Sequence, residues 1–307
     1  MAIAGEAPNP GGAFDALVEL EGLSLLNRSG EAPQFVVHRL VQEVTRLRQE
    51  LAQEPHELAA ALAWIDAAFV GEPQDVRSWP VLEPLEPHAK TVACFGDGAG
   101  VTGATARLMS QVGMLLLTKA DFCEAEPLMR RALRIDEANY GKDHPDVAID
   151  LNNLAGLLQA TDRLLEAEPL MRRSLRIDEE SYGQDHPRVA LDLNNLAGLL
   201  QATDRLVDAE TMMRRSLQID EASYGKDHPA VARNLNNLAG LLRVTNRLAE
   251  AEPLMHRSLR ILIALKQQGY RHPNLEAGIN NYISFLQVQG FSEEAIQAKI
   301  GSLYQQD

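Results

Sequence analysis

144-HPDVAIDLNNLAGLLQATDRLLEAEPLMRRSLRIDEESYGQD-185 and 186-HPRVALDLNNLAGLLQATDRLVDAETMMRRSLQIDEASYGKD-227 are consecutive segments of the chain that align without a gap. They agree at 33 of 42 positions, and a third copy starts 42 residues later at His228 with HPAVARNLNNLAGLL. A fixed period of this length is typical of repeat proteins, in which each unit packs only against its neighbours.

The same period locates two more copies. Before the clear repeats, MSQVGMLL at 109–116 stands in the place of LNNLAGLL, and FCEAEPLMRRALRIDE follows at 122–137. After them, HPNLEAGINNYISFL at 272–286 begins 44 residues beyond the third copy and leads into FSEEAIQAKIGSLYQ. This last copy is typical of a divergent capping repeat. We therefore expect an array of about five repeats over residues 104–307.

Each period contains two helical patterns. In the first, Val147, Leu151, Leu154 and Leu158 share one helical face, and in the second an apolar stripe runs over residues 167–177. Residues 160–163 turn the chain between the helices. In 182-YGQDHP-187, Gly suits a helix C-terminus, His or Asp a cap, and Pro the first helical turn. Because one helix pair cannot bury its apolar face, the sequence predicts an all-α fold, a right-handed superhelical solenoid of stacked helix-turn-helix repeats.

Over residues 104–298 the recurring HPxVAxxLNNLA and AExLxxRxL motifs resemble the tetratricopeptide repeat family, and within it the repeats of kinesin light chains. The resemblance implies a scaffold that holds a protein or peptide in a concave groove, where Asn side chains of the first helix grip an extended backbone. Gln111 stands at the Asn position of the degenerate copy. The groove residues that this resemblance and the helical spacing predict are Asn152, Asn153, Gln159, Asn194, Asn195, Gln201, Arg233, Asn236, Asn237, Arg243, Asn280 and Asn281.

Several of these patterns have a second interpretation. The Asn residues could instead bond to a neighbouring repeat and only support the scaffold. Gly156, Gly198 and Gly240, each in mid-helix, either leave room for a ligand or let two helices approach closely. The His residues that begin the repeats, such as His144, are expected to cap helices rather than to bind metal. Only Arg233 and Arg243 lie near the groove, which does not favour recognition of acidic motifs.

Composition excludes several functions. The net charge of −14 argues against nucleic acid and anionic membranes as partners. Neither a long apolar run nor a secretory leader is found, so we expect a cytoplasmic protein. Cys94 and Cys123 are expected to be buried, reduced thiols, and no spacing suggests a metal or cofactor. The acidic pairs that recur with the period, such as Asp178-Glu179, are expected to be solvated helix ends, so we predict no catalytic site and no enzyme.

The first hundred residues lack the period. Residues 1–50 predict a winged-helix-like α+β segment with a short hairpin between two helices, and residues 51–103 a helical linker. The sequence LEGLSLLNRSG…FVVHRLVQEVTR resembles the winged-helix end of NB-ARC signalling ATPases. In that family a His at the position of His38 contacts the nucleotide. The alternative function is therefore a regulatory fragment of such an ATPase. The chain has no G-x-x-x-x-G-K-[ST] loop, so ATPase activity is not expected.

Overall fold

The computed structural model describes residues 26–28, 35–37, 55–267 and 275–304. The chain forms two compact units, Met1–Ala61 and Leu62–Asp307. The first contains two short strands, β1 (Leu26–Arg28) and β2 (Phe35–Val37), which pair antiparallel with Leu26 opposite Val37. They lie where the hairpin was predicted. The two helices predicted on either side of the hairpin, and His38, fall outside the described residues, so the winged-helix unit stays a prediction.

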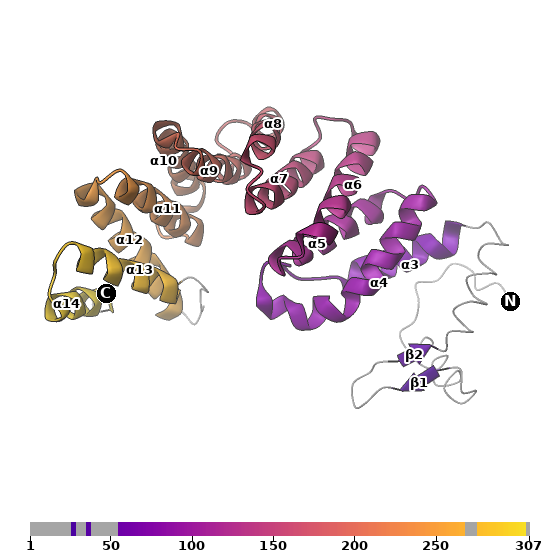
Figure 1. The fold of residues 1–307 in the computed structure, drawn as a ribbon, viewed down its shortest axis with the longest axis horizontal. Coiled ribbons are helices and arrows are strands. Elements are labelled where there is room, and N and C mark those ends of the chain that lie inside the picture. The colour runs from indigo at the N-terminus through magenta and orange to yellow at the C-terminus, as the bar shows by residue number, and fades with distance from the viewer. Residues whose placement is uncertain (1–25, 29–34, 38–54, 268–274, 305–307) are drawn as a thin grey trace. The chain divides into compact units, whose positions relative to one another are not determined.

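The described part of the second unit is helical (Figure 1). It starts within α3 (Pro55–Ala68) and continues through η1 (Val76–Ser78) and α4 (Trp79–Gly98), which packs on α5. Five helix pairs follow, each packed against the next: α5 (Gly103–Thr118) and α6 (Phe122–Tyr140), α7 (Pro145–Ala160) and α8 (Leu164–Tyr182), α9 (Pro187–Ala202) and α10 (Leu206–Tyr224), α11 (Pro229–Val244) and α12 (Leu248–Gln267), and α13 (Leu275–Val288) and α14 (Glu293–Tyr304). The predicted stack of helix pairs is confirmed, while its handedness and the three-part domain division stay predictions.

Histidine caps the first helix of the clear repeats, as predicted. The Nδ1 atoms of His144, His186 and His228 each accept a hydrogen bond of 3.2 Å from the backbone N–H two residues on. Each imidazole also stacks on the Tyr four residues earlier, with ring centroids 4.3–4.7 Å apart. The contacts of these imidazole rings are therefore local: each ring caps the start of a helix and stacks on a nearby Tyr. The corresponding His272 lies outside the described residues.

Two backbone positions per repeat take positive φ and so fix the turns. Gly183 and its equivalents end the second helix at φ values of 85–89°, a conformation that suits glycine. Between the helices of a pair, Asp162, Asp204 and Asn246 have φ values of 58–61°, and Asp and Asn are the non-glycine residues that best tolerate the left-handed region. The repeated turn chemistry therefore gives the pairs α7–α8, α9–α10 and α11–α12 the same connection between their two helices.

The core of each pair is built from the predicted apolar faces. Val147, Ala148, Leu151 and Ile177 form one buried cluster, and Val189, Ala190, Leu193 and Ile219 form the same cluster one repeat later. Because the clusters recur with the period, each pair presents the same apolar surface to its neighbour. Packing therefore leaves the opposite face of the first helices free to form a groove.

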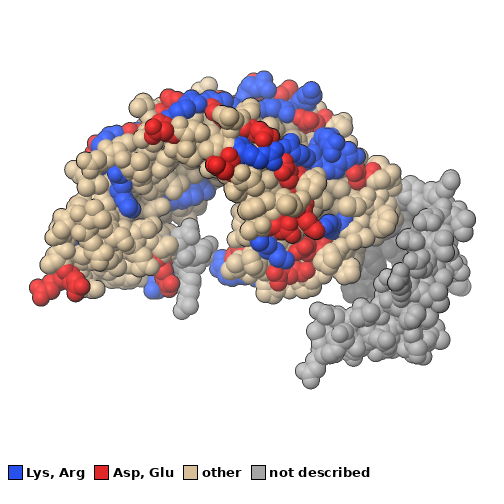
Figure 2. Space-filling view, viewed as in Figure 1, with Lys and Arg blue, Asp and Glu red and all other residues tan. Residues whose placement is uncertain are grey.

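The second helices are joined by ion pairs along the outer face. Arg163 contacts Glu126 of the preceding pair at 2.8 Å and Glu166 of its own helix at 2.8 Å, and Arg205 and Arg247 repeat this pattern. Figure 2 shows the resulting alternation of basic and acidic side chains over α6, α8 and α10. These arginines already contact carboxylates of the chain, so they are poorly placed to bind an acidic ligand on the outer face.

Candidate ligand groove of the repeat array

The first helices of the pairs carry matching columns of Asn, Gly and Gln on the face that turns away from the core. In α9, Asn194, Asn195, Gly198 and Gln201 are half-buried, whereas Leu193 and Leu196 on the other side are buried. The predicted separation of a polar face from the Leu stripe is confirmed. We call this polar face of α7, α9, α11 and α13 the groove face.

An open hollow of about 400 Å³ lies on the groove face between α7, α9 and α11. Met213 of α10 supplies its single long apolar side chain. The hollow gathers six of the predicted groove residues, together with two of the mid-helix glycines: Gln159, Asn194, Asn195, Gly198, Gln201, Asn236, Asn237 and Gly240. Its lining is thus uncharged and rich in side-chain amides.

Some of the asparagines bond to the neighbouring repeat. Asn153 donates from Nδ2 to the Ser110 hydroxyl at 3.2 Å, and Asn237 donates to Asn194 Oδ1 at 3.0 Å. Asn152 donates to the Asp192 carboxylate. The scaffolding interpretation therefore applies to these side chains, which hold successive first helices together.

The other predicted groove residues are not engaged in this way. Within the described part of the chain, none of them makes a side-chain hydrogen bond. Arg233 forms a long ion pair with Asp220, in which Nη2 lies 3.8 Å from Oδ2. Asn280 and Asn281 of α13 and Arg243 of α11 are exposed. The residues without a side-chain hydrogen bond, all half-buried or exposed, are Gln159, Asn195, Gln201, Asn236, Arg243, Asn280 and Asn281.

The three mid-helix glycines face open space. A Cβ atom added at Gly156, Gly198 or Gly240 would meet no heavy atom within 4 Å, apart from the helix's own backbone and the chain neighbours. They are therefore not needed for close helix approach, which removes one of the two interpretations of these residues. Because these glycines have no side chain, the groove face is hollowed between the columns of amide side chains.

Sequence reasoning missed a layer of buried polar side chains beneath the groove face. Asp150, Asp192 and Asn234 occupy the same position in three successive repeats and are 0–4% exposed. Asp150 accepts a 2.9 Å hydrogen bond from Ser110, and Asn234 donates at 2.9 Å to both Ser216 and Asp220. The signal was present in the helical spacing, because Asp150 lies three residues after Val147 and four before Leu154, on the core face.

Burial determines the ionisation of this layer. It raises the pKa of Asp150 to about 7, an effect that the Ser110 hydrogen bond opposes and the nearby Asp136 reinforces. It likewise raises the pKa of Asp192 to about 7, against the hydrogen bond from Asn152 and with repulsion from Asp178. One oxygen each of Asp150 and Asp178 has no hydrogen-bond partner among the described residues. Asp150 and Asp192 therefore bind a proton more tightly than an ordinary Asp does.

Two predictions about single residues are wrong. Asp178 and Asp220, expected at solvated helix ends, are 3% and 1% exposed, and burial raises the pKa of both. They are buried because the second helix packs its last turn against the first helix of the next pair. Cys94 and Cys123, expected to be buried, are both exposed.

The described residues contain no group of three or more His, Cys, Asp or Glu side chains that could hold a metal ion. Among the helices of the described ranges, none combines the length and the apolar character that a membrane crossing requires.

Solved structures share the fold. BtubC (BKLC) from P. vanneervenii is 20% identical, with a TM-score of 0.56 over 81% of this chain and 90% of the other. A putative kinesin light chain from Podosopora anserina, with nearly identical TPR-like repeats, is 19% identical, with a TM-score of 0.52 over 64% of this chain and 93% of the other. The apo form of RapI is 16% identical, with a TM-score of 0.56 over 80% and 65%. At these identities the likeness shows the fold alone.

No curated protein matches the sequence. The tetratricopeptide repeat family matches residues 104–180, 151–204 and 189–264, which together span just over half of the chain. These matches cover the clear repeats and their caps, turns and apolar faces described above. The chain therefore belongs to the tetratricopeptide repeat family, whose members generally serve as scaffolds for protein–protein interaction.

Proposed function

We propose that the array is a non-enzymatic scaffold that binds an extended segment of a protein partner along the groove face. The observation that carries the proposal is the open hollow lined by side-chain amides, several of which make no hydrogen bond within the described residues. An extended backbone presents a donor and an acceptor at each residue, and an amide side chain can satisfy both. An uncharged amide lining therefore suits a peptide backbone better than it suits nucleic acid or an anionic surface.

Hydrogen bonds between repeats on the groove face support this proposal. Asn153 and Asn237 are fixed by bonds to the neighbouring repeat, so they hold the first helices in register while adjacent amides stay available. Groups fixed before binding lose less conformational freedom when the ligand arrives. We further propose a cytoplasmic setting, since both cysteines are free and exposed, which is typical of a reducing compartment.

The test compares two sets of substitutions. The groove variant carries Asn195→Ala, Gln201→Ala and Asn236→Ala, which remove amides that make no hydrogen bond within the described structure. The control variant carries Asn139→Ala and Gln218→Ala, which remove exposed amides from the second helices α6 and α10. Far-ultraviolet circular dichroism and urea unfolding establish that all three proteins are equally folded.

A phage-displayed library of random 12-residue peptides is selected on the intact chain, and the enriched peptides are then titrated against all three proteins. We expect enrichment, with affinity lost in the groove variant and kept in the control variant. Each lost hydrogen bond to a peptide is worth about 0.5–1.5 kcal/mol, so three lost bonds predict a fall of at least about tenfold. The proposal is overturned if no peptide is enriched, or if the groove variant binds the enriched peptides as well as the intact chain does.

A further inference from the structure

A second hollow lies at the last helix pair, outside the groove face. It is open, measures about 470 Å³ and lies between α12, α13 and α14, the last three helices in Figure 1. The residues that line it are Glu252, Pro253 and His256 of α12, Tyr282 of α13, and Lys299 and Ser302 of α14. None of them is a predicted groove residue, so the groove proposal does not use this hollow.

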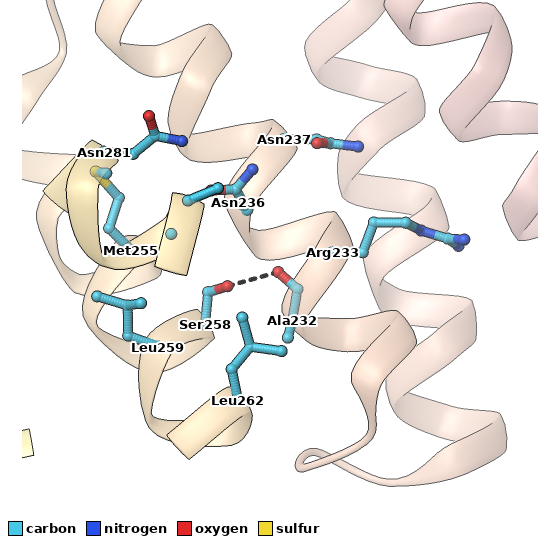
Figure 3. A pocket seen from close by; sticks show the side chains of 11 residues that line it. Ala232, Arg233, Asn236, Asn237, Met255, Ser258, Leu259, Leu262 and Asn281 are labelled. Carbon is cyan, nitrogen blue, oxygen red and sulfur yellow. Dashed lines mark hydrogen bonds between the residues drawn. The ribbon is translucent and has the colours of Figure 1, made fainter. Parts of the chain in front are cut away.

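The hollow lies where α14 departs from the packing of the earlier second helices. In the preceding pair, Ser258 of α12 donates a 2.7 Å hydrogen bond to the backbone carbonyl of Ala232 in α11, and Met255 of α12 is buried nearby (Figure 3). The aligned Ser302 instead donates at 2.8 Å to the Lys299 carbonyl of its own helix, and Lys299 stands in the place of Met255. Among the described residues, the last pair therefore lacks both this bond between its helices and the buried Met side chain.

The ion pairs of the outer face are also replaced here. In the preceding repeat, Glu210 contacts two arginines, one four residues later in its own helix and one at the start of the next second helix. His256 and Phe291 stand at the aligned positions of the last repeats. Glu252, which aligns with Glu210, therefore has Lys299 as its one ion-pair partner among the described residues, at 2.6 Å.

Two polar groups of the hollow have no partner among the described residues. Tyr282 replaces the Leu238 of the preceding repeat and is 1% exposed, yet its hydroxyl makes no hydrogen bond there. Burial raises the pKa of this hydroxyl, so it remains a donor. His256 likewise makes no hydrogen bond, and burial, with repulsion from Arg260 and Lys299, lowers its pKa, so the neutral ring offers one donor and one acceptor. Because an unpaired buried hydroxyl costs free energy, a ligand that bonds to it gains affinity.

The charges of the hollow indicate a ligand that carries both signs. The side chains of Lys299 and Glu252 are 36% and 28% exposed, so each can make further hydrogen bonds. The hydrogen bond with Glu252 raises the pKa of Lys299, which keeps the ammonium group charged. A simple anion is attracted by Lys299 but repelled by the adjacent Glu252, and a simple cation meets the reverse. A ligand with an ammonium and a carboxylate on one carbon can place each beside the opposite charge without separating the ion pair.

We propose that this hollow binds a free α-amino acid with a polar side chain. Lys299 donates to the carboxylate of the ligand, and Glu252 accepts from its ammonium group. The Tyr282 hydroxyl and the His256 imidazole bond to its side chain. The site is independent of the groove proposal and adds a small-molecule ligand to one end of an array that binds protein.

Two variants and a matched control test the site. Lys299→Met introduces the residue that the fold accommodates at the aligned position, Met255, and removes the ammonium group. Tyr282→Phe removes only the unpartnered hydroxyl and keeps the buried ring. Lys266→Met is the control, because Lys266 is an exposed residue of α12 that does not line the hollow. Circular dichroism and urea unfolding establish that all four proteins are folded.

Binding of each proteinogenic amino acid to the intact chain is measured by nuclear magnetic resonance, from the ligand signals and from the imidazole signal of His256. Acetate and methylammonium, the two charged halves of the ligand, are measured in the same way. We expect asparagine, glutamine or serine to bind more tightly than alanine and to shift the His256 signal, and neither half to bind. Lys299→Met should lower affinity at least about tenfold, because hydrogen bonds to charged groups are the stronger ones. Tyr282→Phe should lower it about two- to tenfold and weaken the preference over alanine.

The proposal is overturned if no amino acid binds the intact chain, or if acetate or methylammonium binds as tightly as the amino acids do. It is also overturned if Lys299→Met binds as the intact chain does, or if Lys266→Met loses as much affinity as Lys299→Met. Peptides selected on the groove should bind Lys299→Met and the intact chain equally, so this proposal and the groove proposal can fail separately.

Discussion

At the residue scale, the same buried position is filled by two chemically different side chains. Asn234 is a neutral donor and bonds to the Asp220 carboxylate at 2.9 Å. Asp192 occupies that position one repeat earlier, faces repulsion from Asp178, and has a pKa raised to about 7 by burial. An ionised Asp192 cannot donate a hydrogen bond, whereas a protonated one can. The stability of the packing around Asp192 therefore depends on pH. The packing around Asn234 is less sensitive to pH.

Asp192→Asn is expected to stabilise the array at high pH. The folded pKa of about 7 exceeds the ordinary value for Asp, so the folded state binds the proton more tightly than the unfolded chain does. Stability from this group is thus present at low pH and is lost as pH rises from about 4 to about 7. The substitution should raise the free energy of unfolding on the order of 2 kcal/mol at pH 8 and change it little at pH 4.

Urea unfolding followed by circular dichroism at pH 4, 6 and 8 measures this difference. Asp185→Asn is the control, because Asp185 is exposed and makes no ion pair or side-chain hydrogen bond within the described residues. It should leave the profile unchanged. A gain from Asp192→Asn that is larger at pH 4 than at pH 8 would show that the buried carboxyl is ionised and stabilised in the fold.

Gly198→Ala is expected to stabilise α9 and to weaken peptide binding. A Cβ atom at Gly198 meets nothing within 4 Å, so only the helical preference of Ala remains, worth about 0.5–1 kcal/mol. Gly113→Ala is the matched control, since its Cβ would lie 2.7 Å from Cγ of Met129, and it should destabilise the fold. Urea unfolding and titration with a selected peptide check both effects. If stability and affinity rise together, the open glycine column does not serve the ligand.

At the element scale, arginines connect each second helix to the one before it. Arg215 of α10 contacts Glu179 of α8 at 2.7 Å and donates to the backbone carbonyl of Gln184 at 3.0 Å. Arg173 and Arg257 repeat both contacts one period away. One arginine thus contacts both the preceding second helix and the loop that follows that helix. An ordinary surface ion pair connects only two side chains.

Arg215→Met is expected to lower the free energy of unfolding by about 1 kcal/mol, because it removes a part-buried ion pair and a hydrogen bond to a carbonyl. Arg176→Met should have almost no effect, since Arg176 and its Asp143 partner are 59% and 63% exposed and 3.4 Å apart. The ion-pair share of the Arg215 effect should shrink in 1 M salt, where charges are screened. Equal losses in the two variants would contradict this assignment.

Helices, caps and turns could be predicted from the sequence because each depends on neighbouring residues. His186, Pro187 and Gly183 act within one turn of the chain, so their spacing carries the information. The buried layer could not be predicted in full, because Asn153 bonds to Ser110 and Asn152 to Asp192, residues about 40 positions away. Which amides support the scaffold and which remain open depends on packing between repeats, and adjacent Asn residues such as Asn194 and Asn195 differ in this respect.

At the scale of the whole molecule, the array behaves as a row of units that contact mainly their neighbours. Packing runs from each helix pair to the next, with weaker contacts between the first helices α5, α7 and α9. In such a row stability is close to the sum of the repeats and the interfaces between them. One interface of this kind lies between the two most similar repeats of the chain, residues 144–185 and 186–227.

Inserting a second copy of residues 186–227 directly after Asp227 should therefore lengthen the array without altering its ends. The new copy meets an existing type of interface on both sides, because Arg215, Glu179 and their equivalents recur at the same spacing. One more helix pair buries more surface, so the urea m-value and the midpoint should both rise. The groove face would gain another pair of amide columns, so a longer selected peptide should bind the extended chain more tightly than the native one. A lower midpoint, or an unchanged m-value, would show that the repeat 186–227 requires its native predecessor, residues 144–185, and that the units are not interchangeable.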